Sequence, residues 1–117
     1  MTQTPKRMST DRVAIDPAVT SQMEKCRRRI DELDAEIVQL LNARADCALT
    51  LGRLKESVGL GTYQPTRERA VLEHARGENR GPLDASAITR LFERIIDENR
   101  RLERLAEAQD SGDGKNT

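Results

Sequence analysis

Hydrophobic residues recur at helical spacing along most of this chain. From Ile30 to Val58 they follow one another three, four or seven positions apart, and no proline interrupts the run. This pattern predicts one helix that ends near residue 58, with Asp16 as its N-terminal cap and Pro17 in its first turn, although Ser21 is a competing start. Such a helix is roughly 60 Å long, about twice the diameter of a compact domain of this size. We therefore expect it to pair with a second chain.

Two shorter helices are expected to follow. Gly59 to Gly61 ends the long helix, and Thr66 is expected to cap a second helix that ends near residue 76. After a second break, Asp84 is expected to cap a third helix, along which apolar residues recur as far as Ala106. The pattern contains no strand candidate. It predicts an all-α chain of three helices, long, short and medium.

The two ends of the chain lack this periodicity. We expect a disordered N-terminal leader over residues 1–16, a helical domain over 17–108 and a disordered tail over 109–117. There is no apolar run of about 18 residues, and the N-terminus has no hydrophobic segment of the kind found in signal peptides. The sequence therefore predicts a soluble, cytoplasmic protein.

Composition and charge restrict the possible partners. The 117 residues include one Tyr, one Phe and no Trp, while 34% are charged, which favours narrow Leu, Ile and Ala seams between helices. Twenty basic and twenty acidic residues cancel, so no overall field attracts nucleic acid or an anionic membrane. Any anion site must be local. Cys26 and Cys47 lie about 31 Å apart on one helix, which excludes a disulfide within it.

Two cations interrupt the apolar row of the long helix. Arg44 and Lys55 occupy positions where the period favours a hydrophobic residue, and a charge there is costly unless an anion meets it. They are eleven residues apart, which corresponds to about 20° of rotation and roughly 16 Å of rise. The pair can converge on one small anion. Alternatively, both side chains extend from the edge of a helical seam and pair with acidic residues of a neighbouring helix.

Further polar residues lie near the same apolar faces. Asn99 and Glu103 are one turn apart on the third helix, and Arg67 and Glu68 begin the second helix, whose N-terminal dipole adds positive potential. Cations, a carboxylate and hydrogen-bonding groups together suit a small polyanion that carries a hydroxyl. Taken singly, both glutamates are also typical of a solvated surface, and Asn99 of a buried amide that sets helix register.

Arg27 adds another cation, but helix geometry separates it from Arg44. Seventeen residues between them correspond to about 25 Å along the axis and roughly 100° around it. Arg27 can therefore join the same site only from a second subunit. An antiparallel pairing of the long helices would bring it there.

Several segments together carry a family resemblance. They are RRRIDELDAEIVQLLNAR, then GRLK at 52–55, YQPTRE at 63–68 and GPLDASAITRLFERIIDENRRLE, and they span about residues 23 to 105. In order and spacing they resemble the all-helical AroQ class of chorismate mutase. The resemblance implies an intertwined homodimer with two active sites that converts chorismate, a small dicarboxylate, to prephenate by a Claisen rearrangement. It also implies that no metal or cofactor takes part.

The resemblance further implies roles for individual residues. Arg44 binds one substrate carboxylate, and Arg27 of the partner subunit binds the other. Lys55 hydrogen-bonds to the ether oxygen that breaks and to the carboxylate beside it. Glu68 binds the ring hydroxyl, and Arg67 supports the electrostatics nearby.

At three positions the chain differs from the commonest pattern of that family. Asn99 stands where Ser is frequent, and Glu103 where Gln is frequent, beside Lys55 at the ether oxygen. An ionised Glu103 would repel the charge that develops there, whereas a protonated one can donate a hydrogen bond. Gln64 replaces a frequent Asp next to the ring substituent. This leaves open a mutase for 4-amino-4-deoxychorismate or an isochorismate lyase.

A non-enzymatic alternative also fits the helical pattern. The chain can be a helical dimerisation or regulatory module, with an enzyme of the shikimate pathway as its partner. Loss of chorismate absorbance on adding the purified protein would exclude this alternative.

Overall fold

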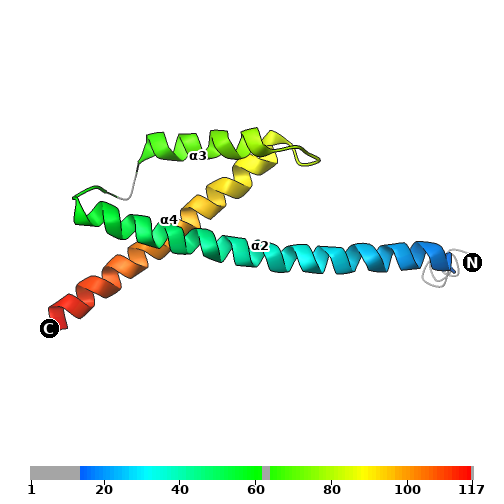
Figure 1. The fold of residues 1–117 in the computed structure, drawn as a ribbon, viewed down its shortest axis with the longest axis horizontal. Coiled ribbons are helices and arrows are strands. Elements are labelled where there is room, and N and C mark those ends of the chain that lie inside the picture. Colours follow the sequence, from blue (N-terminus) through cyan, green and yellow to red (C-terminus); the bar gives the residue numbers. More distant parts are fainter. Residues whose placement is uncertain (1–13, 62–63, 117) are drawn as a thin grey trace, which may run out of the picture. The chain divides into compact units, whose positions relative to one another are not determined.

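The structure is a computed structural model that describes residues 14–61 and 64–116, with the side chains of 111–116 excepted. Its helices are α2 (Pro17–Ser57), α3 (Pro65–Glu78) and α4 (Ala85–Asn116), and no strand occurs in these ranges (Figure 1). This confirms the all-α chain of long, short and medium helices. The chain divides into two compact units, Met1–Val38 and Gln39–Thr117, with the boundary inside α2.

The first unit contains the N-terminal part of α2. The backbone N–H of Ala18 donates a hydrogen bond of 2.9 Å to Asp16 Oδ1, so Asp16 caps the helix as expected, ahead of Pro17. Large hydrophobic side chains recur along this part of the helix, and they are between 38% and 56% exposed: Val19, Met23, Ile30, Leu33, Ile37 and Val38. Among the described residues of this unit, 14–38, no other element covers the apolar row.

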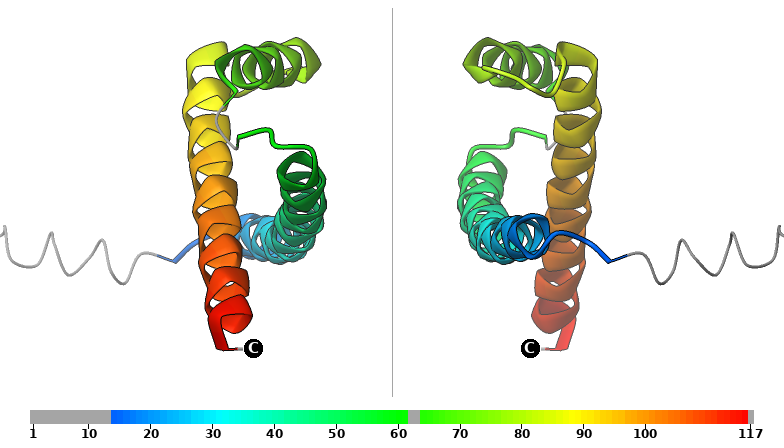
Figure 2. Two further views of the ribbon diagram at one scale, coloured as in Figure 1. Left: turned by 90° about the vertical axis from the view of Figure 1, so that its left-hand side faces the viewer. Right: turned by 90° about the vertical axis from the view of Figure 1, so that its right-hand side faces the viewer.

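In the second unit, α4 contacts both other helical segments. α3 packs against the N-terminal part of α4, where Arg76 Nη1 donates a hydrogen bond of 3.1 Å to Thr89 Oγ1 and Ala75 is buried. Residues 39–57 of α2 lie near the C-terminal half of α4, on a different part of that helix from α3 (Figure 2).

The end of α2 is fixed by a glycine. Gly59 has a φ of +79°, which a residue without a Cβ adopts easily. The N–H of Leu60 bonds to the carbonyl of Lys55 at 2.8 Å, and the N–H of Gly59 to that of Glu56 at 3.1 Å. This pair of bonds is the Schellman motif, and it confirms the predicted stop. The next two loop residues, 62 and 63, lie outside the described residues.

The starts of α3 and α4 differ in how well they were predicted. Asp84 caps α4 as expected, because its Oδ1 accepts a 2.7 Å hydrogen bond from the N–H of Ala87. The prediction that Thr66 caps α3 is wrong, since Gln64 is the cap and Pro65 is the first helical residue. Proline has the φ of a helix already and no N–H to satisfy, so it favours a start at its own position.

The expected domain limits lie partly outside the described residues. Most of the predicted leader, residues 1–13, lies outside the described residues, and 14–16 are not helical. The backbone of α4 continues to Asn116, past the expected limit at 108, so the predicted tail is helical over the residues described. None of the described helices combines the length and the hydropathy needed to cross a membrane.

Candidate functional site

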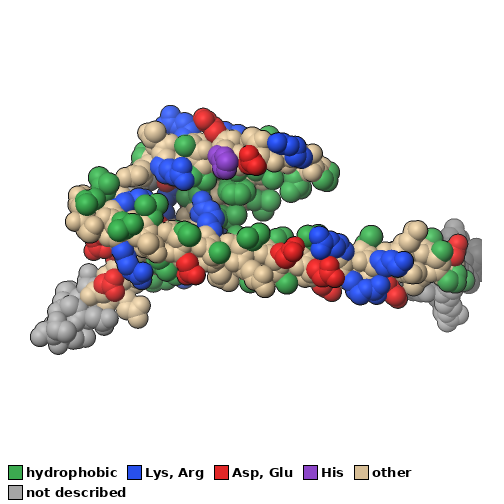
Figure 3. Space-filling view, viewed as in Figure 1, with side chains coloured by type: hydrophobic (Ala, Val, Ile, Leu, Met, Phe, Trp, Pro, Cys, Tyr) green, Lys and Arg blue, Asp and Glu red, His purple; other side chains and the backbone are tan. Residues whose placement is uncertain are grey.

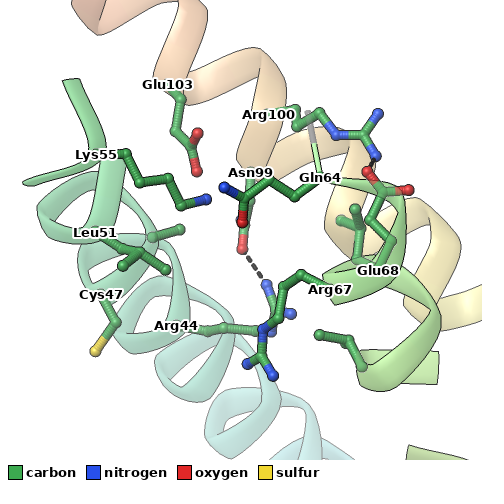
Figure 4. A pocket seen from close by; sticks show the side chains of 13 residues that line it. Arg44, Cys47, Leu51, Lys55, Gln64, Arg67, Glu68, Asn99, Arg100 and Glu103 are labelled. Atoms are coloured by element: carbon green, nitrogen blue, oxygen red, sulfur yellow. Dashed lines mark hydrogen bonds and ion pairs between the residues drawn. The ribbon is translucent and has the colours of Figure 1, made fainter. Parts of the chain in front are cut away.

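A cavity of about 250 Å³ lies in the second unit between the C-terminal part of α2, the start of α3 and the middle of α4 (Figures 3 and 4). Figure 3 shows the hollow below α3, with basic side chains inside it. Seven of the eight residues expected from the sequence line it: Arg44, Lys55, Gln64, Arg67, Glu68, Asn99 and Glu103. Arg27, the eighth, belongs to the first unit and is not among the lining residues.

Arg44 reaches from α2 to α4. Its Nη1 donates a short hydrogen bond to Asn99 Oδ1, shown as a dashed line in Figure 4. An amide oxygen orients the guanidinium plane without cancelling its charge. This contact differs from the alternative in which Arg44 pairs with an acidic residue of a neighbouring helix. The positive charge at this wall of the cavity remains available to an anion.

Lys55 and Glu103 face each other across the opposite end of the cavity (Figure 4). Glu103 is only 9% exposed, and this burial raises the pKa of its carboxyl above the ordinary value. This desolvation is the largest effect on the pKa. The positive charges of Lys55 and Arg100 lower the pKa, and the negative charge of Glu107 raises it further. The carboxyl therefore stays protonated to a higher pH than an exposed glutamate does.

The Glu103 carboxyl is buried without a full set of partners. Its Oε2 has no hydrogen bond to any of the residues described, and a buried polar oxygen of this kind is costly unless a ligand or water satisfies it. Gly52 of α2 makes room for it, because a Cβ there would lie 3.4 Å from Glu103 Oε2. A larger side chain at 52 would push the carboxyl away from its place beside Lys55.

The start of α3 supplies polar groups to a third wall. Gln64 has extended backbone (φ −133°, ψ 92°), and its side chain makes no capping bond to the helix, so the amide is available to the cavity. Arg67 and Glu68 follow in the first turn. Arg67 is exposed although it lines the cavity, as is Cys47, which indicates that the cavity opens to the surface here.

Sequence reasoning missed one charged residue of this site. Arg100 of α4 lines the cavity and forms an ion pair with Glu68 of α3. Its position next to Asn99 in the sequence could have suggested it as a site residue. However, residue 101 is also an arginine, and the helical period alone does not decide which of the two faces α3. The apolar part of the wall was not predicted either, and consists of Ala48, Leu51, Val71 and Ile96.

The lining carries a positive excess. Four cations (Arg44, Lys55, Arg67 and Arg100) and two carboxyls (Glu68 and Glu103) give the lining a net charge of +2, or +3 when Glu103 is protonated. Apolar side chains beside these charges lower the local dielectric and strengthen their effect. Across the described residues, no three His, Cys, Asp or Glu side chains are grouped so that they could hold a metal ion. The arrangement suits a small dianion with a further hydrogen-bonding group.

Comparison with known proteins agrees with this chemistry. The sequence profile of the family chorismate mutase type II matches residues 26–104. A bifunctional chorismate mutase/prephenate dehydratase of Pseudomonas aeruginosa is 40% identical over an alignment of 80 positions that covers 64% of this chain and 22% of that protein. Its counterpart from Neisseria gonorrhoeae is 44% identical over 79 residues, 67% of this chain and 21% of that protein.

A solved structure shares the fold. The chorismate mutase of Thermus thermophilus, in its form II, superposes with a TM-score of 0.69 at 32% identity, covering 71% of this chain and 94% of that one. The chain spans only about a fifth of the length of the curated relatives, since the matched regions are 22% and 21% of those proteins. The shared part is thus the mutase region of longer enzymes.

Proposed function

Because this chain belongs to the chorismate mutase type II family, we propose that it is an isomerase that converts chorismate to prephenate. The observation that carries the proposal is the cavity in which Arg44 and Lys55 of α2 lie opposite Glu68 of α3 and Glu103 of α4. Its net positive lining matches a substrate with two carboxylates, and its apolar wall matches a carbon ring. The roles that follow are part of this proposal.

The main requirement of the reaction is that the enzyme positions the substrate. In a pericyclic rearrangement no proton is transferred and no covalent intermediate forms, so the enzyme must hold the flexible enolpyruvyl arm in a reactive chair. Two guanidinium groups that each bind one carboxylate fix both ends of the molecule. Arg44, already oriented by Asn99, is one of them. Arg27 of the partner subunit is the other.

Lys55 supplies the electrostatic part of catalysis. Negative charge accumulates on the ether oxygen as the C–O bond stretches, so a cation beside it stabilises the transition state more than the ground state. Protonated Glu103 donates a second hydrogen bond to the same oxygen. Gln64 and Glu68 bind the substituent at position 4 of the ring, with Arg67 beside them at the mouth of the cavity.

The active form is an intertwined homodimer. The exposed hydrophobic row of the first unit supports this, because a helix with such a row is stable only when another surface covers it. Arg27 lies on the same stretch of α2 as that row. A second copy that covers the row therefore brings its own cavity to Arg27.

The place of the protein in metabolism is also part of the proposal. We expect it to act in the cytoplasm, in the biosynthesis of aromatic amino acids from shikimate. The bifunctional relatives join a chorismate mutase to a prephenate dehydratase in one chain. This supports the proposal that the partner of this protein is an enzyme that consumes prephenate.

The deciding experiment is a continuous absorbance assay of the purified full chain with three substrates side by side. Chorismate, 4-amino-4-deoxychorismate and isochorismate differ at the ring position that Gln64 is expected to face. We expect the largest kcat/KM for chorismate, because the Glu68 carboxylate accepts a hydrogen bond from a ring hydroxyl. A preference for another substrate would assign a related mutase or lyase. No turnover of any of them would favour a non-catalytic dimerisation module.

The buried carboxyl predicts a pH dependence. Since burial raises the pKa of Glu103, the protonated form, which donates a hydrogen bond, is still present in mildly acidic solution. It is lost as the pH rises through the raised pKa. We expect kcat with chorismate to be higher at mildly acidic pH than at about pH 8. A series of kcat measurements across this range, at saturating substrate, tests the expectation.

Two variants identify the group responsible. Glu103→Gln keeps a donor at every pH and should flatten the profile. Glu107→Gln removes a like charge that raises the pKa of Glu103, so it should move the decline to lower pH. If the wild-type protein and Glu103→Gln show the same profile, Glu103 is not the titrating group.

A further inference from the structure

Arg100 and Glu68 form an ion pair at the wall of the main cavity. It joins α4 to α3: Arg100 Nη2 meets Glu68 Oε2, the carboxylate oxygen that is buried (Figure 4). Both side chains are largely enclosed, with 23% and 28% of their surface exposed. Such a pair is screened less by water and salt than a surface pair is.

The same pair forms a wall between two cavities. Glu68, Ile96 and Arg100 line the main cavity and also a second one, which Leu72, Glu93 and Asp97 complete. The second cavity therefore has three carboxyls and one cation around it. Arg100 Nη1 lies 3.9 Å from Asp97 Oδ1, so the guanidinium also faces a carboxylate of its own helix.

Without this cation, the surroundings of Glu68 would be acidic on one side. A partly enclosed carboxylate is repelled by neighbouring carboxylates and turns toward solvent more readily than one held by a cation. Such a turn would disturb its contact with a substrate hydroxyl.

We propose that Arg100 is a positioning residue that acts through Glu68. By pairing with the buried oxygen, it fixes the carboxylate at the cavity wall, where the carboxylate accepts a hydrogen bond from the ring hydroxyl of the substrate. Arg100 also separates the main cavity from the acidic one behind it. This inference rests on the proposed function and adds to it a residue that touches Glu68 rather than the reacting atoms.

The chain offers a matched control in the adjacent residue. Arg101 has the same side chain on the same helix, but it is 67% exposed, it pairs with Glu98 at 4.0 Å, and it is not one of the residues that line the main cavity. Replacing either arginine removes one positive charge from α4. Only the replacement of Arg100 removes the cation that holds Glu68.

The test is a steady-state comparison of Arg100→Gln and Arg101→Gln in the full-length protein with chorismate. We expect Arg100→Gln to lower kcat/KM by about tenfold or more, the usual effect of losing a hydrogen bond to a charged group, and Arg101→Gln to change it by less than about twofold. Arg100→Lys keeps the charge and should recover part of the loss. Equal losses in the two glutamine variants, or a faster Arg100→Gln enzyme, would overturn the proposal.

A double-mutant cycle separates positioning from a general effect on folding. In the Glu68→Gln background, Arg100→Gln should cause no further loss, because the carboxylate on which it acts is already absent. Losses that multiply would show that Arg100 acts independently of Glu68. If thermal melting shows that Arg100→Gln is poorly folded, the cycle is run with Arg100→Lys instead. Losses in kcat/KM that multiply in that cycle would also overturn the proposed role of Arg100.

The same data distinguish this role from the proposed function itself. A wild-type protein that does not turn over chorismate would overturn both. An active wild-type enzyme with independent effects at 68 and 100 would overturn only the role of Arg100.

Discussion

Lys55→Ala should lower kcat for chorismate by about 10²–10³-fold, the effect seen when one preorganised donor is removed from a developing negative charge. Lys55 lines the cavity opposite Glu103, and we propose that it lies beside the ether oxygen. Since this charge develops only as the bond breaks, kcat should fall much more than KM rises. Initial rates over a range of chorismate concentrations measure the two separately.

Arg53→Ala is the matched control for this variant. Arg53 lies two residues before Lys55 on α2, is exposed and does not line the cavity. Both changes remove one cation from the same part of the helix, so a general effect of charge or helicity would appear in both. If Lys55→Ala retained wild-type kcat, or if Arg53→Ala lost as much activity, the assignment of Lys55 to the ether oxygen would be wrong.

The second large effect concerns the site shared between subunits. Arg27→Ala and Arg44→Ala are each expected to lower kcat/KM by about 10²-fold or more, because each removes one of the two groups that hold the substrate carboxylates. Mixing the two inactive proteins through unfolding and refolding should restore activity. A heterodimer then has one site with both arginines and one site with neither.

The extent of recovery can be estimated. Random pairing of equal amounts makes half of the dimers mixed, and half of their sites are intact, so about a quarter of wild-type activity should return. Arg44→Ala mixed with Lys55→Ala is the control, because both residues belong to the cavity of one chain and no pairing yields an intact site. Recovery in the control, or none in the test mixture, would exclude a site completed by Arg27 of the partner subunit.

Much of the fold was predictable because it depends on local chemistry. The helical period, the Asp16 and Asp84 caps and the glycine at 59 each act within a few residues, and all were found where expected. The start of α3 was predicted too late in the sequence, with Thr66 instead of Gln64 as the cap. Two local signals competed there, and the proline at 65 prevailed over the hydroxyl at Thr66.

The candidate site was predictable for a different reason. Charged and polar residues at core positions of a helix are costly, so they stand out in the hydrophobic pattern, as Arg44, Lys55, Asn99 and Glu103 did. Arg100 did not stand out, because it follows Asn99 in a run of two arginines. Its selection over Arg101 depends on the angle at which α4 faces α3, which no local rule gives.

The sequence by itself determined that there are three helices, the caps at Asp16 and Asp84, the stop at Gly59 and which residues carry charges at apolar positions, because all of these follow from contacts within a few turns. Only the tertiary structure decided which of those charges meet. It placed Arg44 against Asn99, paired Arg100 with Glu68 and buried Glu103. These contacts join residues up to 55 positions apart, and they depend on how helices pack in three dimensions. The burial that raises the pKa of Glu103 arises in the same way.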